Sequence, residues 1–264
     1  MSLLAARELD RLGYADGPLH RLDARAKLLV SAGFLVAVAS FPRYEVAGLA
    51  PFALGPCALA AVGRVPLRPI LRLVLAASPF AVLVGLANPF LDTAPAARVA
   101  GVTLSGGLLS FLSIVLRFGL CTSTLLLLVA TTPLPRLARG LRALGAPAAL
   151  SLQLTMLYRY LFLLLEEGER LAAARLLREP ARRLPRFATA HRMLSVLLHR
   201  TFERGARVYR CMLVRGFEGE LPSLRSEGLR RADALFLAAG LGLCLAGRLF
   251  PLTRWAGTLL ARGS

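Results

Sequence analysis

The sequence lacks the residue patterns that most catalytic and metal-binding sites require. It contains no Walker A sequence, no Gly-x-Ser-x-Gly and no His-Glu-x-x-His, which mark phosphate-binding loops, serine hydrolases and zinc peptidases. His191 and His199 are eight residues apart on one predicted helix, too far to share a metal ion without further ligands. No Cys-x-x-Cys pair occurs among the four scattered cysteines, Cys57, Cys121, Cys211 and Cys244. We therefore expect no catalytic residue, no cofactor and no metal site in this chain.

Acidic residues and lysine are also scarce. Asp and Glu together number 15 against 33 Lys and Arg, giving a net charge of +18, and Lys27 is the only lysine. On a soluble protein this charge would indicate nucleic-acid binding. However, a hydrophobic fraction of 56% and a mean hydropathy of +0.61 are far too high for a soluble domain of this length. The composition predicts an integral membrane protein that contacts the lipid bilayer and no nucleic acid.

Five apolar runs are candidates to cross the bilayer, which takes about 20 residues of helix. They are residues 26–41, 46–62, 70–91, 106–132 and a last run from 232 to about 247. The second run is interrupted by Pro51 and Pro56. These runs predict about five transmembrane helices.

Positive charge is concentrated in one block. Residues 133–231 contain 19 arginines, 8 glutamates and no aspartate, a net charge of +11. Basic segments next to membrane spans face the cytoplasm, so we expect this block there, together with the amino terminus and the 63–69 turn. The chain then divides into an N-terminal membrane region, 1–132, a cytoplasmic region, 133–231, and a C-terminal membrane segment, 232–264. We predict a multi-pass protein of the inner (cytoplasmic) cell membrane.

Four arginines lie outside this simple topology. Arg117 falls near the middle of the fourth span, where a charge is costly and requires a partner, and no acidic residue in the spans is an obvious mate. Arg117 either has a functional role, or its side chain snorkels to the membrane surface or marks an interruption of the helix. Arg248, Arg254 and Arg262 follow the last span. Either they lie outside the cell, or the C-terminal segment lies along the membrane interface.

The basic block is predicted to form one short and two long helices. Residues 135–144 alternate arginine with leucine, as in an amphipathic helix. Long helices follow over about 146–178 and 186–216, which makes the protein all-α, a polytopic membrane protein with long cytoplasmic amphipathic helices. Apolar faces of this breadth must pack on one another or on other proteins. They include Leu154, Leu157 and Leu161 on the first long helix and Leu194, Leu197 and Leu198 on the second.

The two long helices share a repeated arrangement, Glu-x-Gly-x-Arg-x7-Arg. It begins at Glu166 and at Glu203, and its last arginines are Arg178 and Arg215. Glu179-Pro180 follows the first copy and Gly216 the second, and both are residues typical of a helix end. An arginine in the last turn can simply cap the helix. Capping does not require a shared frame, so the repeat favours two arginine tips that insert into an acidic partner.

These residues resemble the transmembrane (T) component of energy-coupling factor transporters, which are ATP-driven vitamin and metal importers. The likeness begins at Leu22 to Leu29, continues through Tyr158-Arg159-Tyr160 and is strongest over 203–222. The family carries two Ala-Arg-Gly-like motifs at the tips of its coupling helices. Val214-Arg215-Gly216 is similar to the second, and the first falls at Arg178 or, in a rival placement, at Arg175. The stretch 212–222 is most similar to the cobalt branch, the CbiQ type.

The resemblance implies a non-catalytic scaffold and coupling subunit in a larger complex. Its partners would be two ATPase subunits, which bind the ATP, and a substrate-binding membrane (S) subunit that holds the metal. A small accessory membrane subunit could be a further partner. The arginine tips would pair with carboxylates of the ATPases. The six leucines named above would face the S subunit. The substrate would be cobalt, with nickel or a vitamin as alternatives.

Two functions of other classes compete with this interpretation. A polytopic enzyme of lipid metabolism could use the arginine block to bind anionic head groups, but the sequence contains no catalytic constellation for it. A stand-alone secondary transporter would carry paired discontinuous spans in two halves, whereas the only internal repeat here lies in the basic block.

Overall fold

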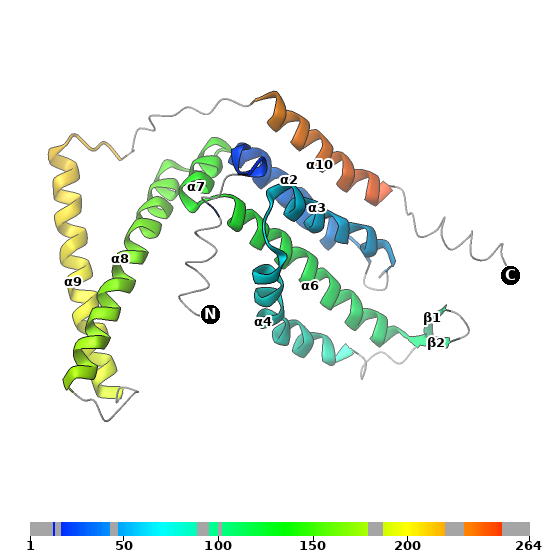
Figure 1. The fold of residues 1–264 in the computed structure, drawn as a ribbon, viewed down its shortest axis with the longest axis horizontal. Coiled ribbons are helices and arrows are strands. Elements are labelled where there is room, and N and C mark those ends of the chain that lie inside the picture. Colours follow the sequence, from blue (N-terminus) through cyan, green and yellow to red (C-terminus); the bar gives the residue numbers. More distant parts are fainter. Residues whose placement is uncertain are drawn as a thin grey trace. The chain divides into compact units, whose positions relative to one another are not determined.

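The computed structural model divides the chain into two compact units (Figure 1). The first unit is formed within residues 1–140 and 227–264, and the second within residues 141–226. The residues that the structure describes are 13, 17–42, 47–88, 95–99, 102–178, 187–219 and 230–249.

The described chain is almost entirely helical, which confirms the all-α class. The first unit contains the 3-10 helices η1 (Leu19–Arg21) and η2 (Ala47–Ala53) and the α-helices α2 (Ala24–Ala39), α3 (Leu54–Gly63), α4 (Leu67–Leu86), α6 (Gly106–Thr131) and α10 (Arg231–Leu249). Helix α7 (Leu134–Ala143) begins in the first unit and ends in the second. The second unit contains α8 (Ala148–Arg178) and α9 (Phe187–Val214). A short antiparallel hairpin of β1 (Pro95–Val99) and β2 (Val102–Ser105), which the sequence did not predict, precedes α6.

The predicted spans form helices of unequal length. By length and composition, three described helices could cross a membrane: α4, α6 and α8. Helix α2 has 16 residues, about 24 Å of rise, which is less than the ~30 Å of a hydrocarbon core. Pro51 lies within η2, so the second run consists of a 3-10 helix followed by the short α3. The sequence assigned α8 to the cytoplasm, yet its leucine-rich first half meets the same criterion as α4 and α6.

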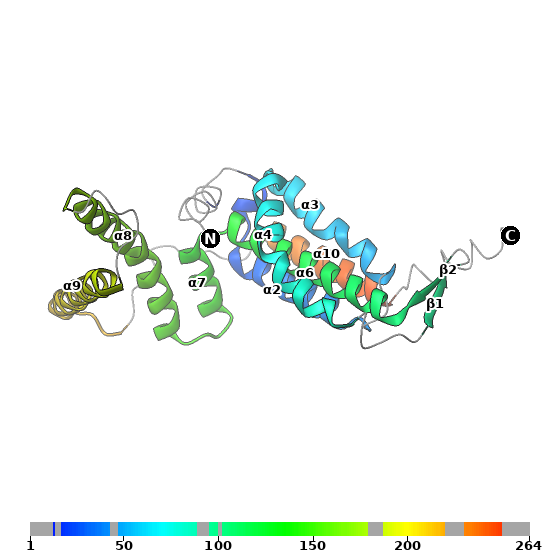
Figure 2. The same ribbon diagram turned by 90° about the horizontal axis from the view of Figure 1, so that it is seen from below.

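Helix α6 is the centre of the first unit and contacts α2, α3, α4 and η2 (Figure 2). Two apolar clusters join these elements. In one cluster the ring of Phe52 packs against those of Phe34 and Phe41, at centroid distances of 5.7 and 5.3 Å, and Leu120 of α6 and Cys244 of α10 complete it. The other cluster consists of Ala60, Val65, Ile70, Leu127 and Ala130, from α3, α4, α6 and the turn between α3 and α4.

Two glycines allow α2 and α10 to lie against each other. A Cβ atom on Gly33 would lie 2.6 Å from Leu241 Cδ2, and one on Gly240 would lie 2.7 Å from Val30 Cγ1. Both distances are below any normal carbon contact. Small residues at crossing points are how membrane helices approach closely.

We expect Gly240→Val to destabilise the first unit by about 1–3 kcal/mol, because the added atoms would overpack the contact with Val30. The matched control is Gly242→Val, two residues along α10, where a Cβ meets no atom within 4 Å. Thermal unfolding in detergent should show a lowered Tm for the first variant only. Equal Tm values for both variants would contradict the close approach.

Buried polar groups join the starts of α2 and α10. Asp233 is 2% exposed, and its carboxylate accepts hydrogen bonds from the backbone N–H groups of Asp23 and Arg230, both at 2.8 Å. The Asp23 carboxylate accepts in turn from the Arg25 N–H at 3.0 Å and caps α2. Lys27, 3% exposed, donates from Nζ to the Thr131 carbonyl oxygen and to Thr132 Oγ1, so it ties α2 to the end of α6. The only lysine is thus a structural residue.

Two arginines bind the carboxyl end of α2. Arg117 Nη2 donates to the Pro42 carbonyl oxygen at 2.6 Å, and Arg248 Nη2 donates to the Ser40 carbonyl oxygen at 3.1 Å. The Arg248 guanidinium also lies over the Phe41 ring, 4.9 Å from its centroid. The last carbonyls of a helix lack partners within it and carry negative partial charge. The partner of Arg117 is therefore a backbone carbonyl just past a short span. Arg254 and Arg262 lie outside the described residues.

Candidate functional site

The second unit is a hairpin of two long antiparallel helices, α8 and α9 (Figure 1). Glu167 of α8 accepts a hydrogen bond and ion pair from Arg200 of α9. Few side chains are buried: Ser151 is the only one among the described residues of α8, and there is none among those of α9. The hairpin therefore presents most of its surface to other molecules or to lipid.

The repeated Glu-x-Gly-x-Arg frames lie in the middle of both helices. In the second copy, Glu203 lies 3.8 Å from Arg207 Nη1 and 3.3 Å from His199 Nε2, one helical turn away on either side. These side chains are more than half exposed, and exposed pairs contribute only about 0–1 kcal/mol each. Local stability therefore gives little reason for the repeat.

The two arginine tips lie at opposite ends of the hairpin. Arg178 is the last residue of α8 and is exposed; Arg215 immediately follows α9 and is exposed as well. The Glu167–Arg200 pair marks a level at which the two helices meet. Arg178 is 11 residues from Glu167, and Arg215 is 15 residues from Arg200 in the opposite direction. At 1.5 Å of rise per residue, the two tips are therefore about 40 Å apart along the hairpin. Neither guanidinium forms a hydrogen bond or ion pair with another described residue. Arg175, the rival position one turn earlier, is half-buried and has an interaction within the chain.

Arg215 is presented by a tight helix end. Gly216 has φ +76°, its N–H donates to the Leu213 carbonyl oxygen at 3.0 Å, and the Phe217 N–H donates to the Met212 carbonyl oxygen at 3.1 Å. This pair of bonds is the Schellman motif, in which the residue after the helix adopts the left-handed conformation that glycine allows. Val214 is 89% exposed. The local sequence thus stops α9 and leaves Val214 and Arg215 projecting.

Gly216→Ala is expected to destabilise this helix end by about 1 kcal/mol, because an L-residue pays for the left-handed conformation. Gly205→Ala is the matched control: Gly205 lies inside α9, and a Cβ there meets no atom within 4 Å. That change should stabilise by about 0.5–1 kcal/mol. Thermal unfolding of the two variants should therefore shift in opposite directions; a shift of the same sign would contradict the assigned cap.

The apolar positions of the hairpin remain largely uncovered within this unit. Leu157 is 56% exposed and Leu194 55%, while Leu161 and Leu198 are also exposed. Leu154 and Leu197 are half-buried. Exposed leucines on this scale indicate an interaction surface or contact with lipid.

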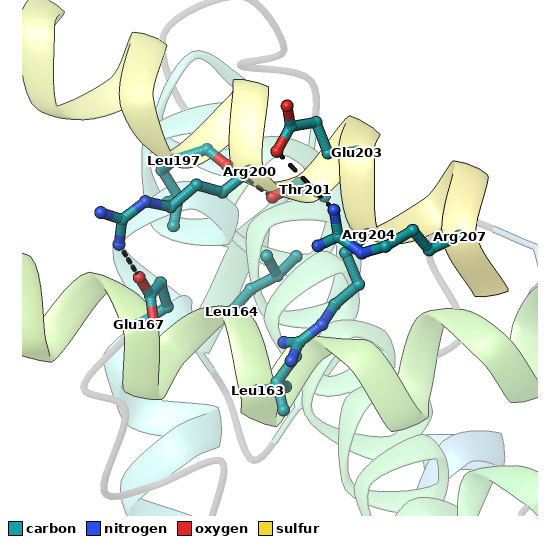
Figure 3. A pocket seen from close by; sticks show the side chains of 9 residues that line it. All are labelled: Leu163, Leu164, Glu167, Leu197, Arg200, Thr201, Glu203, Arg204 and Arg207. Carbon is teal, nitrogen blue, oxygen red and sulfur yellow. Dashed lines mark hydrogen bonds and ion pairs between the residues drawn. The ribbon is translucent and has the colours of Figure 1, made fainter.

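A pocket of about 180 Å³ lies between α8 and α9, around the repeated frames (Figure 3). The sequence analysis missed it, because it requires knowing which faces of the two helices meet. One feature of the sequence could have indicated it: the residue between Glu and Gly of the repeated frame is Glu167 in the first copy and Arg204 in the second, two opposite charges. The lining residues are Leu163, Leu164 and Glu167 of α8 and Leu197, Arg200, Thr201, Glu203, Arg204 and Arg207 of α9.

The described residues contain no group of three or more His, Cys, Asp or Glu side chains that could hold a metal ion. His199 lies beside Glu203, and His191 is exposed elsewhere on α9. Transported cobalt would be cargo, and these residues offer no built place for it.

Comparison with known proteins decides the family. The profile of the CbiQ family, described as cobalt transport protein, matches residues 16–225. The chain belongs to the CbiQ family. The match includes α2 to α9, and with them both arginine tips. Together with the apolar helices, membership makes the protein a multi-pass membrane component of a cobalt transport system, which confirms the resemblance inferred from the sequence.

One curated relative is itself without an assigned role. The chain is 25% identical over 233 residues to MJ1571 of Methanocaldococcus jannaschii, a protein described as uncharacterized. The alignment covers 84% of this chain and 79% of the relative.

Proposed function

We propose that this CbiQ-family protein is the coupling subunit of an ATP-driven cobalt importer. It would hold two ATPase subunits on its cytoplasmic side and a substrate-binding membrane subunit at its apolar helix faces. ATP would bind and be hydrolysed on the ATPases, and the metal would bind the substrate-binding subunit. The chain itself would carry no catalytic residue.

The observation that carries this proposal is the placement of the two arginine tips. Arg178 and Arg215 lie at opposite ends of the α8–α9 hairpin, about 40 Å apart along the helices. A single groove cannot take both, whereas two copies of one ATPase can each take one. Arginine suits this task because its planar guanidinium pairs bidentately with carboxylates.

The hairpin provides a mechanical connection between the tips. Helices of 31 and 28 residues move as rigid rods when their ends are displaced. When ATP draws the two ATPases together, the tips follow and the crossing of α8 and α9 changes. Leu157, Leu161, Leu194 and Leu198, exposed along these rods, would transmit that change to the substrate-binding subunit.

Purification of the tagged protein from its native membranes in mild detergent tests the proposed assembly. We expect two ATPase copies per chain and one small, very apolar membrane protein to co-purify, and we expect cobalt to remain with the latter. Mass spectrometry of the eluate identifies the subunits and their ratio. If the chain elutes without any ATPase from membranes that are active in ATP-driven cobalt uptake, the coupling role is wrong.

A further inference from the structure

We propose that the pocket between α8 and α9 binds the phosphate of an anionic lipid head group, held by Arg204. The proposal goes beyond the coupling role and does not depend on it. Arg204 projects from α9 toward Leu163 of α8 and lines the pocket (Figure 3).

The first step of the argument is charge. Three arginines and two glutamates line the pocket. Arg200 is paired with Glu167, and Arg207 is paired with Glu203. Arg204 forms no ion pair or hydrogen bond with the residues that the structure describes. The pocket therefore has one positive charge that no lining glutamate neutralises, and a bound anion would neutralise it.

The second step is the position of the pocket along α8. Residues 148–165 carry a single charged side chain, that of Arg159, whereas residues 166–178 carry six, beginning with Glu166. The pocket is lined on α8 by Leu163, Leu164 and Glu167, so it lies where the apolar half ends. In a hairpin that lies along the membrane surface, this change from apolar to charged side chains faces the lipid head groups.

The third step selects the source of the anion. Exposed leucines adjoin the pocket on both helices, including Leu161 one turn from Leu164 and Leu198 beside Leu197. In the chain without its substrate-binding subunit, acyl chains would cover these leucines, whereas a free phosphate would leave them exposed to water. The basic block, with its net charge of +11, also attracts anionic lipids to this surface. A lipid therefore accounts for both features, because its phosphate pairs with Arg204 and its acyl chains cover the leucines.

Native mass spectrometry of the purified full-length chain with added lipid tests this site. We expect phosphatidylglycerol to bind at least about fivefold more tightly than phosphatidylcholine, because one arginine alone contributes about that ratio to anionic lipid binding. Arg204→Ala should lower this preference about fivefold, and Arg204→Lys should keep most of it. Arg192→Ala is the control, because Arg192 is exposed on the same helix and does not line the pocket.

Inorganic phosphate as a competitor separates the two possible sources of the anion. Because it lacks acyl chains, an equal concentration should leave phosphatidylglycerol bound; full displacement would show a site for soluble phosphate and overturn the lipid assignment. Equal binding of the two lipids to the wild-type chain, or an unchanged preference in Arg204→Ala, would overturn the site itself. Circular dichroism should show the same helix content in all variants. None of these measurements involves an ATPase, so failure here leaves the coupling role untouched.

Discussion

ATP-driven cobalt uptake is expected to fall by at least about a thousandfold when Arg178 and Arg215 are both replaced by alanine. Each tip would lose one side of a charged hydrogen-bonded pair in an ATPase groove, which costs about 2–5 kcal/mol. Either single change should weaken ATPase attachment or uncouple hydrolysis from uptake, since one tip still holds the complex. Arg215→Lys should rescue only in part, because an ammonium cannot reproduce the planar fork of a guanidinium. Uptake of radioactive cobalt by intact cells measures the effect.

The matched control for this double variant removes two other arginines from the same helical hairpin. Arg192 and Arg210 are exposed on α9, so Arg192→Ala with Arg210→Ala changes the net charge equally without touching a tip. We expect this control to transport cobalt at near the wild-type rate. Both variants should fold normally, since Arg178 and Arg215 are exposed in the isolated chain. Normal assembly and uptake by the double tip variant would refute the coupling proposal.

Loss of the Asp233 carboxylate is expected to be the most destabilising single change in the first unit. Asp233→Ala would leave the buried N–H group of Asp23 without its acceptor and would remove the acceptor of the part-buried Arg230 N–H. Hydrogen bonds to a charged group contribute about 1.5–3 kcal/mol each. Because water can replace the acceptor at the exposed Arg230, the two together predict a loss of about 3–5 kcal/mol. Because these bonds join the starts of α2 and α10, we expect α10 to detach first. Thermal unfolding in detergent, followed by circular dichroism, measures the loss.

Two further variants make this prediction specific. Asp233→Asn keeps one good acceptor oxygen and should lose less than half as much stability as Asp233→Ala. Glu218→Ala removes an exposed carboxylate of the second unit and should change the free energy of unfolding by under about 0.5 kcal/mol. If Asp233→Ala unfolds at the same temperature as Glu218→Ala, the buried carboxylate does not hold these helices together.

Much of the secondary structure could be predicted because its causes are local in the chain. The long helices expected over 146–178 and 186–216 are found as α8 and α9, which end at Arg178 and Val214. Pro180 and Gly216 are the local reasons for these ends, since proline constrains its predecessor and glycine allows the left-handed turn. The interruption at Pro51 was predicted on the same ground. The family likewise follows from short motifs that are contiguous in the sequence.

Other features could not be predicted because they depend on which distant segments meet. The sequence offered no acidic partner for Arg117, and the structure supplies the carbonyl oxygen of Pro42, 75 residues away. Because every residue has a backbone carbonyl group, the sequence does not show which carbonyl accepts a hydrogen bond from a distant side chain. The pairing of Asp233 with the start of α2 spans 210 residues and is equally invisible. The pocket at Arg204 exists only because two particular helix faces come together.

By itself, the sequence determined that this is an all-α membrane protein of the CbiQ family with two arginine-tipped helices. Hydropathy, charge bias and helix-ending residues depend only on short segments of the chain, so the sequence alone predicts the spans, their orientation and the helix ends. The tertiary structure alone decided that the tips lie at opposite ends of one hairpin and that Arg204 has no counter-charge among the residues that the structure describes. The relative direction of two helices and the pairing of their side chains depend on which helices are in contact. These contacts form when apolar faces that are far apart in the chain are buried against each other.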